Sequence, residues 1–213
     1  MYDFNQKSNK EFYKIKCVIL GDANIGKTSL VMRYLYGKFN QFSESTIGCS
    51  YSNCNIPYNS NIYRLDIWDT AGQERYRGLM PMYYRNADIV FLCIDLSEED
   101  NNKLVSEYNY WKSQIDKHND NEDRLIFLVG TKSDIKIERT EEELREILDE
   151  KEYIYIETSA KEGVNVKDVF QNAVKEISKI KREKTEKKSD KTELIIATKP
   201  KTSWFSNYKC TIL

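Results

Sequence analysis

The sequence has little of several residue types on which common functional sites depend. Its 213 residues include one histidine, three prolines and eight glycines, and its five cysteines form no Cys-x-x-Cys pair. A structural zinc site is therefore not expected, and a catalytic pair built on histidine would have to use His118. Scattered, unpaired cysteines are typical of free thiols in a reducing compartment.

Long apolar runs and an excess of basic charge are also absent. The longest uninterrupted apolar run, 89–94, is far shorter than the roughly 18 residues of a membrane span. Lysine and arginine number 33 and aspartate and glutamate 34, which gives a net charge of −1. This balance argues against a dedicated nucleic-acid-binding protein. With 40% hydrophobic residues, the chain suits one globular domain with short appendages.

Strand-like and helix-like segments alternate along the chain. Apolar and β-branched runs predict strands at 13–20, 51–56, 62–68, 89–94, 125–129 and 153–156. Helical spacing predicts helices within 26–37, 97–115, 140–148 and 166–180, with Ser97 as one N-cap and a Thr140–Glu143 capping box as another. Such alternation predicts a doubly wound α/β fold with a mostly parallel six-stranded sheet flanked by helices.

The composition changes near residue 182. We expect residues 1–11 to form an N-terminal extension, 12–182 the folded domain and 183–213 a flexible C-terminal tail. The mixed charge run that begins the tail has no apolar stripe, so it predicts a solvated linker or a frayed helix. An apolar cluster at 194–197 is the exception within this run, and chance clustering would explain it equally well.

The first motif that carries chemistry is Gly21-Asp22-Ala23-Asn24-Ile25-Gly26-Lys27-Thr28, which matches GxxxxGK[ST] between a predicted strand and a predicted helix. Its N–H groups and the helix N-terminus can cradle phosphates. Lys27 would place a positive charge on the terminal phosphates, and Thr28 would bind Mg²⁺. A chance glycine-rich turn is the alternative, which the strand–loop–helix context disfavours. The motif indicates a nucleoside triphosphate but not its base.

Three further motifs each follow a predicted strand. They are Trp68-Asp69-Thr70-Ala71-Gly72-Gln73-Glu74, Thr131-Lys132-Ser133-Asp134 and Glu157-Thr158-Ser159-Ala160-Lys161. A carboxylate at the position of Asp69 can hold Mg²⁺ through water, and Gly72 leaves its backbone N–H free to approach a γ-phosphate. Asp134 by itself could be an ordinary turn aspartate, but the strand before it and the motif after it favour a binding role.

Five motifs in this order resemble the Ras superfamily of small GTPases over roughly residues 12–182, namely GDANIGKT, STIG, WDTAGQE, TKSD and ETSAK. WDTAGQERYR and PMYYRNAD are similar to the Rab branch, and FSESTIG with PMYYR is similar to early-endosomal Rabs. Thr131 departs from this pattern, because most Rabs have Asn there and Rho proteins often have Thr. The segment from Asp134 to Glu157 is too short for the helical insert typical of Rho.

The resemblance assigns roles to individual residues. It implies that Asp134 binds the guanine N1–H and amine, that Lys132 and Phe39 pack on the base, and that Ala160 donates its N–H. It implies Thr28 and Thr46 as Mg²⁺ ligands, Asp69 as a ligand through water, and Gln73 as the catalytic residue that orients water. The full nucleotide-binding set is Ala23, Asn24, Ile25, Gly26, Lys27, Thr28, Ser29, Phe39, Thr46, Gly72, Thr131, Lys132, Asp134, Ser159, Ala160 and Lys161.

The resemblance also implies a cellular role. A membrane-anchored GTP/GDP switch in vesicle trafficking would hydrolyse GTP and recruit effectors through segments near 41–49 and 71–84. It would act as a monomer with an exchange factor, a GTPase-activating protein, a prenylation escort and a GDP-dissociation inhibitor. The C-terminal Cys210-Thr211-Ile212-Leu213 matches a prenylation box. We therefore expect the protein to lie on the cytoplasmic face of an endomembrane, with the endosome as the expected organelle, and to cycle through the cytosol.

Two other functions remain open at this stage. A nucleotide-locked Rab-like scaffold that barely hydrolyses GTP would be favoured by Ala23 and Thr131, whereas Gln73, Thr46 and Lys27 argue against it. A P-loop kinase would need an arginine-rich lid for its second substrate, and the segment after Thr46 contains no such cluster.

Overall fold

The structure of the protein is a computed structural model that describes residues 10–42, 44–118, 121 and 123–197. The chain divides into two compact units, Met1–Ser178 and Lys179–Leu213. All the described strands belong to the first unit, which therefore carries the α/β fold. Cys210 lies outside the described residues, so the expected lipidation site stays a prediction.

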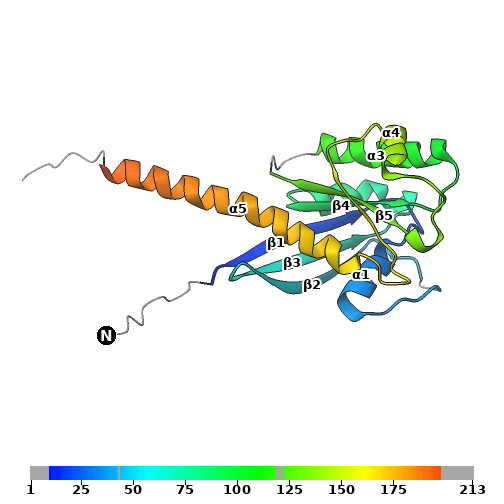
Figure 1. Ribbon diagram of the computed structural model, residues 1–213, viewed down its shortest axis with the longest axis horizontal. Helices are drawn as coiled ribbons and strands as arrows, with labels where there is room; N and C mark the ends of the chain where they lie inside the picture. The colour runs from blue at the N-terminus through cyan, green and yellow to red at the C-terminus, as the bar shows by residue number, and fades with distance from the viewer. Residues whose placement is uncertain (1–9, 43, 119–120, 122, 198–213) are drawn as a thin grey trace, which may run out of the picture. The chain divides into compact units, whose positions relative to one another are not determined.

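A six-stranded sheet with the order β2-β3-β1-β4-β5-β6 forms the centre of the first unit (Figure 1). β2 pairs with β3 in the antiparallel sense, and the other pairings are parallel, which confirms the expected mostly parallel sheet. The strands are β1 (Phe12–Leu20), β2 (Cys49–Tyr58), β3 (Asn61–Thr70), β4 (Ile89–Asp95), β5 (Leu125–Thr131) and β6 (Ile154–Glu157).

Helices connect these strands and cover both faces of the sheet. Figure 1 shows α3 and α4 on one side of the sheet and α1 on the other. The α-helices are α1 (Lys27–Tyr36), α2 (Met80–Tyr84), α3 (Asn101–Lys117), α4 (Glu141–Leu148) and α5 (Val166–Ala197), and the 3₁₀ helices are η1 (Glu74–Leu79) and η2 (Ser133–Ile135). The chain reverses its direction of winding at β1, and in such sheets the crevice at this point binds the ligand.

Side-chain alternation along the central strands divides the core into two layers. Val18, Val90 and Leu92 are buried in the cluster that contains side chains of α2, α3 and α4. On the opposite face, the ring of Phe91 in β4 lies 5.2 Å from that of Phe170 in α5. Because both faces of the sheet are covered, β4 is apolar from Ile89 to Ile94 rather than alternating.

The β2–β3 hairpin explains why these strands are longer than their apolar runs. Asn59 and Ser60 have φ values of +46° and +67°, as a type I′ turn requires, and Tyr58 pairs with Asn61. Pairing therefore extends to the turn and includes Pro57, which is tolerated because β2 lies at the edge of the sheet.

The predicted N-cap of α3 is wrong by three residues. The cap is Asp100, whose side chain accepts a hydrogen bond from the N–H of Asn102. Ser97 instead donates its hydroxyl to Oδ1 of Asp95, 2.6 Å away, and remains in the loop. Both residues are good caps, but only Asp100 lies two residues before an N–H that the helix leaves unpaired. The predicted Thr140–Glu143 capping box of α4 is confirmed.

The charged segment after Arg182 continues α5, which extends to Ala197. Its lysines and glutamates are good helix formers, so a helix can persist here without an apolar stripe. The domain boundary at residue 182 stays a prediction. Within the described residues, none of the helices combines the length and apolar character needed to cross a bilayer.

Candidate functional site

The loop between β1 and α1 follows a tight path that requires glycine. Gly21 and Gly26 have φ values of +137° and +96°, which residues with a Cβ rarely adopt. A Cβ on Gly21 would lie 2.3 Å from Cδ1 of Ile25 and 2.7 Å from the carbonyl oxygen of Cys93. α1 begins at Lys27, so its unpaired N–H groups lie at the end of this loop, where an anion can bind.

Lys27 is buried within this loop. Its Nζ donates hydrogen bonds to the carbonyl oxygens of Gly21 and Asp22, at 2.8 and 2.6 Å. Burial lowers the pKa of the ammonium, and the neighbouring acidic groups, Cys93 and Asp69 first among them, partly oppose this shift. A phosphate in the loop would provide the negative charge that a buried ammonium needs as a partner.

Three oxygen-bearing side chains converge beside Lys27. Oγ1 of Thr28 lies 2.8 Å from Oγ1 of Thr46. Asp69 is 3% exposed, and its Oδ1 has no hydrogen-bond partner among the described residues. Burial raises the pKa of Asp69 to about 6, although the Thr28 hydroxyl and the Lys27 charge oppose the rise. Two hydroxyls and an unsatisfied carboxylate oxygen fit a hard cation such as Mg²⁺.

The segment after β3 starts in direct contact with the phosphate loop, that is, residues 21–26 between β1 and α1. A Cβ on Gly72 would lie 2.2 Å from the carbonyl carbon of Asp22 and 2.4 Å from the nitrogen of Ala23, so only glycine fits. Gln73 follows, and its Oε1 accepts a hydrogen bond from Nε of Arg75 at 2.7 Å. The expected catalytic side chain is therefore in contact with a neighbouring guanidinium.

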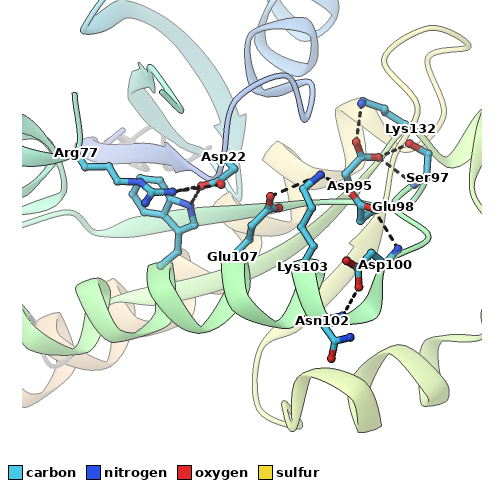
Figure 2. A network of polar contacts seen from close by, with 11 residues as sticks. Asp22, Arg77, Asp95, Ser97, Glu98, Asp100, Asn102, Lys103, Glu107 and Lys132 are labelled. Atoms are coloured by element: carbon cyan, nitrogen blue, oxygen red, sulfur yellow. Dashed lines mark hydrogen bonds and ion pairs between the residues drawn. The ribbon is translucent and has the colours of Figure 1, made fainter. Parts of the chain in front are cut away.

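The side chain of Asp22 links the phosphate loop to two other elements (Figure 2). It accepts hydrogen bonds from Nη2 of Arg77 in η1, at 3.2 and 3.3 Å, and from Nε1 of Trp111 in α3, at 2.8 Å. The Arg77 guanidinium lies 4.2 Å from the ring centroid of Tyr110. Sequence reasoning missed this role for Asp22, because its partners are 55 and 89 residues away in the chain.

The opposite end of the site is formed by the loops after β5 and β6. Oδ1 of Asp134 accepts a hydrogen bond from Oγ of Ser159 at 2.6 Å, and Oδ2 lies 3.8 Å from Nζ of Lys161. Lys132 has a left-handed backbone, with φ of +59°, and its Nζ lies 2.6 Å from Oδ2 of Asp95 (Figure 2). Both charged side chains are thus held in place by neighbouring groups.

A cleft of about 490 Å³ joins the two ends of the site. The structure brings most of the expected residues to its wall. These are Ala23, Asn24, Gly26, Lys27, Thr28, Ser29, Phe39, Thr46, Gly72, Gln73, Thr131, Lys132, Asp134, Ala160 and Lys161. The size suits a nucleotide rather than a macromolecular segment.

Three expected residues do not line the cleft. Ile25 is buried beneath the loop, Asp69 lies behind Thr28, and Ser159 acts on the cleft through Asp134. The wall also contains residues that sequence reasoning did not assign, namely Leu30, Asn40, Gln41, Glu44, Ser45, Thr70, Ile135 and Thr158. Most of them lie next to or within a motif in the sequence, and this proximity is the signal that could have identified them.

Comparison with known proteins decides the family. Residues 16–179 match the Ras family profile. The chain is 37% identical over 164 residues to "Ras-related protein Rab5" of Nicotiana tabacum, covering 76% of this chain and 80% of that protein. It is 38% identical, with the same coverage, to "Ras-related protein RHN1" of Nicotiana plumbaginifolia. It is 34% identical over 174 residues to "Ras-related protein Rab-5A" of Dictyostelium discoideum, covering 81% and 85%.

The chain belongs to the Ras family, in its Rab branch. The Ras-like α/β fold and the Rab5-type relatives confirm the resemblance seen in the motifs. Members of this family are GTP hydrolases, and the enzyme class follows from membership. The cleft contains most of the residues that the resemblance assigns to nucleotide binding.

Thr131, which departs from the usual Rab pattern, contacts two other parts of the site. Its hydroxyl lies within hydrogen-bonding distance of the carbonyl oxygens of Ile25 and of Ile94, the latter at 2.9 Å. It therefore links the base end of the cleft to the phosphate loop and to β4. Because threonine is shorter than the asparagine of most Rabs and cannot make all the same bonds, we expect a lower nucleotide affinity, which stays a prediction.

Tyr51 on β2 belongs to a group of neighbouring aromatic rings. Its ring lies 5.2 Å from that of Trp68, and Trp68 lies 5.9 Å from Tyr83. The Tyr51 hydroxyl donates to Oδ1 of Asp66 at 2.7 Å and accepts from Nη2 of Arg64 at 3.0 Å. The hydroxyl thus fixes this ring on the outer surface of the β2–β3 hairpin.

Proposed function

We propose that this Rab-branch GTPase is a membrane-anchored GTP/GDP switch that acts in vesicle trafficking and recruits effectors in its GTP-bound form. One observation carries the proposal: a single cleft contains the carboxylate of Asp134 at one end and the Thr28–Thr46 hydroxyl pair at the other. A site with both features can bind a guanine base and a magnesium-bound triphosphate together.

Base recognition depends on the carboxylate of Asp134. Its carboxylate accepts hydrogen bonds from the guanine N1–H and the exocyclic amine, two donors that adenine does not present together. Ser159 fixes the carboxylate from behind, and the aliphatic part of Lys132 and the ring of Phe39 cover the faces of the base. Unpaired polar groups would remain if another base entered, which makes such a site selective.

Phosphate binding depends on Lys27 and the N–H groups at the start of α1. The ammonium exchanges its contacts with the Gly21 and Asp22 carbonyls for phosphate oxygens. Thr28 and Thr46 would hold Mg²⁺, with Asp69 acting through water. Mg²⁺, when bound, neutralises charge on the β- and γ-phosphates. Thr46 and Gly72 contact the γ-phosphate through their backbone N–H groups. These contacts order the two switch segments, near residues 41–49 and 71–84.

Hydrolysis depends on orienting a water molecule. Gln73 lines the cleft and would place the attacking water, once its side chain leaves Arg75. Positioning and electrostatic stabilisation carry most phosphoryl transfer, and an activating partner's arginine typically adds roughly 10³–10⁵-fold. In the stimulated reaction of Rabs a glutamine from the partner can replace the intrinsic one.

Effector binding would use the apolar residues of the switch segments. Ile47 and Met82 are 81% and 70% exposed. The rings of Tyr51, Trp68 and Tyr83 form a row of tilted aromatic contacts on β2, β3 and α2. Large apolar side chains at this exposure, next to segments that respond to the γ-phosphate, suit a partner that binds one nucleotide state. An exchange factor and a GTPase-activating protein would act on the same segments.

The membrane anchor would be a prenyl group on Cys210, attached with the help of an escort protein, and a GDP-dissociation inhibitor would return the protein to the cytosol. A single lipid chain gives weak anchoring, so the lysines near the C-terminus would contribute by attraction to anionic lipids. The Rab5-type relatives favour the cytoplasmic face of an endosome.

The nucleotide that co-purifies with the protein tests the proposal directly. Protein purified without added nucleotide should release GDP or GTP on denaturation, identified by chromatography, at close to one mole per mole. Adenosine nucleotides in its place, or no preference between the two bases in a binding titration, would contradict the proposal.

Replacing Gln73 tests the hydrolytic mechanism. Gln73→Leu should slow single-turnover GTP hydrolysis by at least about tenfold while GTP affinity stays the same, because the side chain acts on water rather than on binding. An unchanged rate would remove Gln73 from the mechanism. Wild-type protein that binds GTP tightly but does not turn it over would instead favour the nucleotide-locked scaffold.

Replacing Cys210 tests the anchor. Cys210→Ser should leave the protein in the soluble fraction of cells in which the wild type sediments with membranes. Cys54→Ser is the matched control, because Cys54 lies on β2 within the folded domain. If Cys210→Ser still sedimented with membranes, the lipid anchor would be excluded.

A further inference from the structure

One arginine outside the recognised motifs contacts the guanine-binding loop directly. Arg33 lies in the last turn of α1, and its Nε donates to the carbonyl oxygen of Ala160 at 2.6 Å. Its Nη2 donates to the carbonyl oxygen of Lys161, and its Nη1 to that of Gly37 at 2.9 Å. All three N–H-bearing nitrogens of the guanidinium therefore bind backbone carbonyls.

The loop that Arg33 binds is a compact turn. Ser159 and Val164 form an isolated antiparallel bridge, and the N–H of Gly163 donates to the carbonyl oxygen of Ser159 at 2.8 Å. A Cβ on Gly163 would lie 3.8 Å from Nε of Arg33, and the φ of Gly163 is +81°. The turn thus presents the Ala160 and Lys161 carbonyls to α1, where the guanidinium meets them.

The other end of α1 explains why this contact matters. The same helix begins at Lys27, directly after the phosphate loop, and ends at Tyr36, and its C-cap Gly37 lies two residues before Phe39. Arg33 therefore ties the base-binding loop to the helix that begins at the phosphate site and is followed by the expected base-packing ring. Only arginine offers a planar set of donors that can hold several carbonyls in one fixed arrangement.

We propose that Arg33 is a positioning residue for guanine recognition: by holding the Ala160 and Lys161 carbonyls, it keeps the Ala160 N–H directed at the 6-oxo group of the base. The inference rests on the proposed function. It separates two parts of base recognition: Asp134, held by the side chains of Ser159 and Lys161, recognises the N1–H and the 2-amino group, whereas Arg33 acts on the backbone carbonyls of the loop.

Two base analogues distinguish these parts. 6-Thio-GDP replaces the 6-oxo acceptor with a larger, weaker acceptor and keeps both donors for Asp134. IDP lacks the 2-amino group and keeps the 6-oxo group. Dissociation constants for GDP, 6-thio-GDP and IDP are measured by titration on the full chain, for the wild type and for Arg33→Met.

Arg33→Met should weaken GDP binding about tenfold, and the wild-type preference for GDP over 6-thio-GDP, of roughly fivefold for one hydrogen bond, should fall to near unity. The preference for GDP over IDP should not change. Arg33→Lys, which can hold one of the three carbonyls at a time, should give intermediate values for the first preference. Arg33→Lys also provides the test if Arg33→Met does not fold.

Arg145→Met is the matched control. The Arg145 guanidinium also holds a backbone carbonyl, that of Tyr153, with both Nη atoms at 3.3 Å, but on α4 and away from the cleft. This variant should leave both preferences unchanged. If Arg33→Met weakened all three nucleotides equally, or left the preference over 6-thio-GDP intact, the inference would be overturned while the proposed function stood. A wild type without guanosine preference would overturn the proposed function itself.

Discussion

The base end of the nucleotide cleft and the two switch segments at its phosphate end differ in how they are held in place. At the base end, Ser159 and Lys161 hold Asp134, Asp95 holds Lys132, and Arg33 holds the loop that contains Ala160. At the phosphate end, Thr46 and Gln73 lie on segments whose large apolar side chains face solvent. Ile47, Met82 and Leu79 are 81%, 70% and 46% exposed.

This difference matches what each end has to do. The base is the same in GTP and GDP, so its site gains from side chains that are fixed before binding. The γ-phosphate is present in only one state, so the segments that detect it must have a low local stability without it. One domain can therefore bind guanosine tightly in both states and still change its surface.

The largest expected effect comes from breaking the base end. Asp134→Asn keeps the size of the side chain but places an amide where two donors of guanine need acceptors. GDP affinity should fall by about 10⁴-fold, the scale seen when a site built for hydrogen bonding meets an unmatched partner. Competition titrations with GDP and ADP measure the change.

The control for this variant is Asp149→Asn, because Asp149 is the exposed C-cap of α4 with φ of +48°, a conformation that asparagine also adopts. It should bind GDP like the wild type. With GTP at saturating concentration, Asp134→Asn should hydrolyse within a few-fold of the normal rate, because the phosphate end is intact. A loss of GDP affinity below tenfold would mean that Asp134 does not recognise the base.

A smaller effect should come from breaking the phosphate end. Gly72→Ala places a methyl group 2.2 Å from the carbonyl carbon of Asp22, so the chain must shift at the start of the second switch segment. A displacement on the ångström scale can cost about 10²-fold in rate, and we expect that loss in single-turnover hydrolysis. The preference for GDP over ADP should remain.

Gly78→Ala is the matched control, because it adds the same methyl group to η1, where no atom lies within 4 Å. It should hydrolyse GTP at the wild-type rate. Equal losses in the two variants would indicate that any added side chain disturbs the switch, and the close approach of Gly72 to the loop would not be the cause.

The sequence predicted the residues that line the cleft better than the contacts that hold them in place, for a physical reason. Lys27, Thr28 and Asp134 belong to contiguous motifs at strand ends, so spacing alone places them at one edge of the sheet. The contacts that hold them are not contiguous. Arg33 binds a carbonyl 127 residues away, and Trp111 binds Asp22 across 89 residues.

The fold itself was predicted well, because strand and helix periodicities and the alternation of the two are local signals. Errors occurred where two local signals compete. Ser97 and Asp100 both precede acidic or polar residues that suit a helix start, and the outcome depends on Asp95, which binds the Ser97 hydroxyl. Such a choice is made by tertiary contacts that periodicity does not encode.

The smallest expected effect tests a region outside both ends of the cleft. Glu150 is 2% exposed, and its Oε2 accepts hydrogen bonds from the Tyr108 hydroxyl and from Nζ of Lys112. Its Oε1 accepts from the N–H groups of Glu152 and Tyr153, at 2.8 and 3.1 Å. Burial opposes ionisation, but these donors lower the pKa of Glu150 to about 2.

Because the folded pKa of Glu150 lies below its unfolded value, the ionised carboxylate stabilises the fold above about pH 4.5 and loses this effect as the pH falls toward 2. Between about pH 7 and pH 3.5 the loss should be about 1 kcal/mol of unfolding free energy. Glu150→Gln cannot titrate at this position, so its unfolding free energy should decline by that much less over the same interval, as measured by urea unfolding of both proteins.

The preference of Glu150→Gln for GDP over ADP should equal that of the wild type. If the unfolding free energies of the wild type and of Glu150→Gln changed in parallel with pH, Glu150 would not be ionised in the way its four donors imply. A changed base preference would mean that the base end depends on contacts well beyond the side chains that surround it.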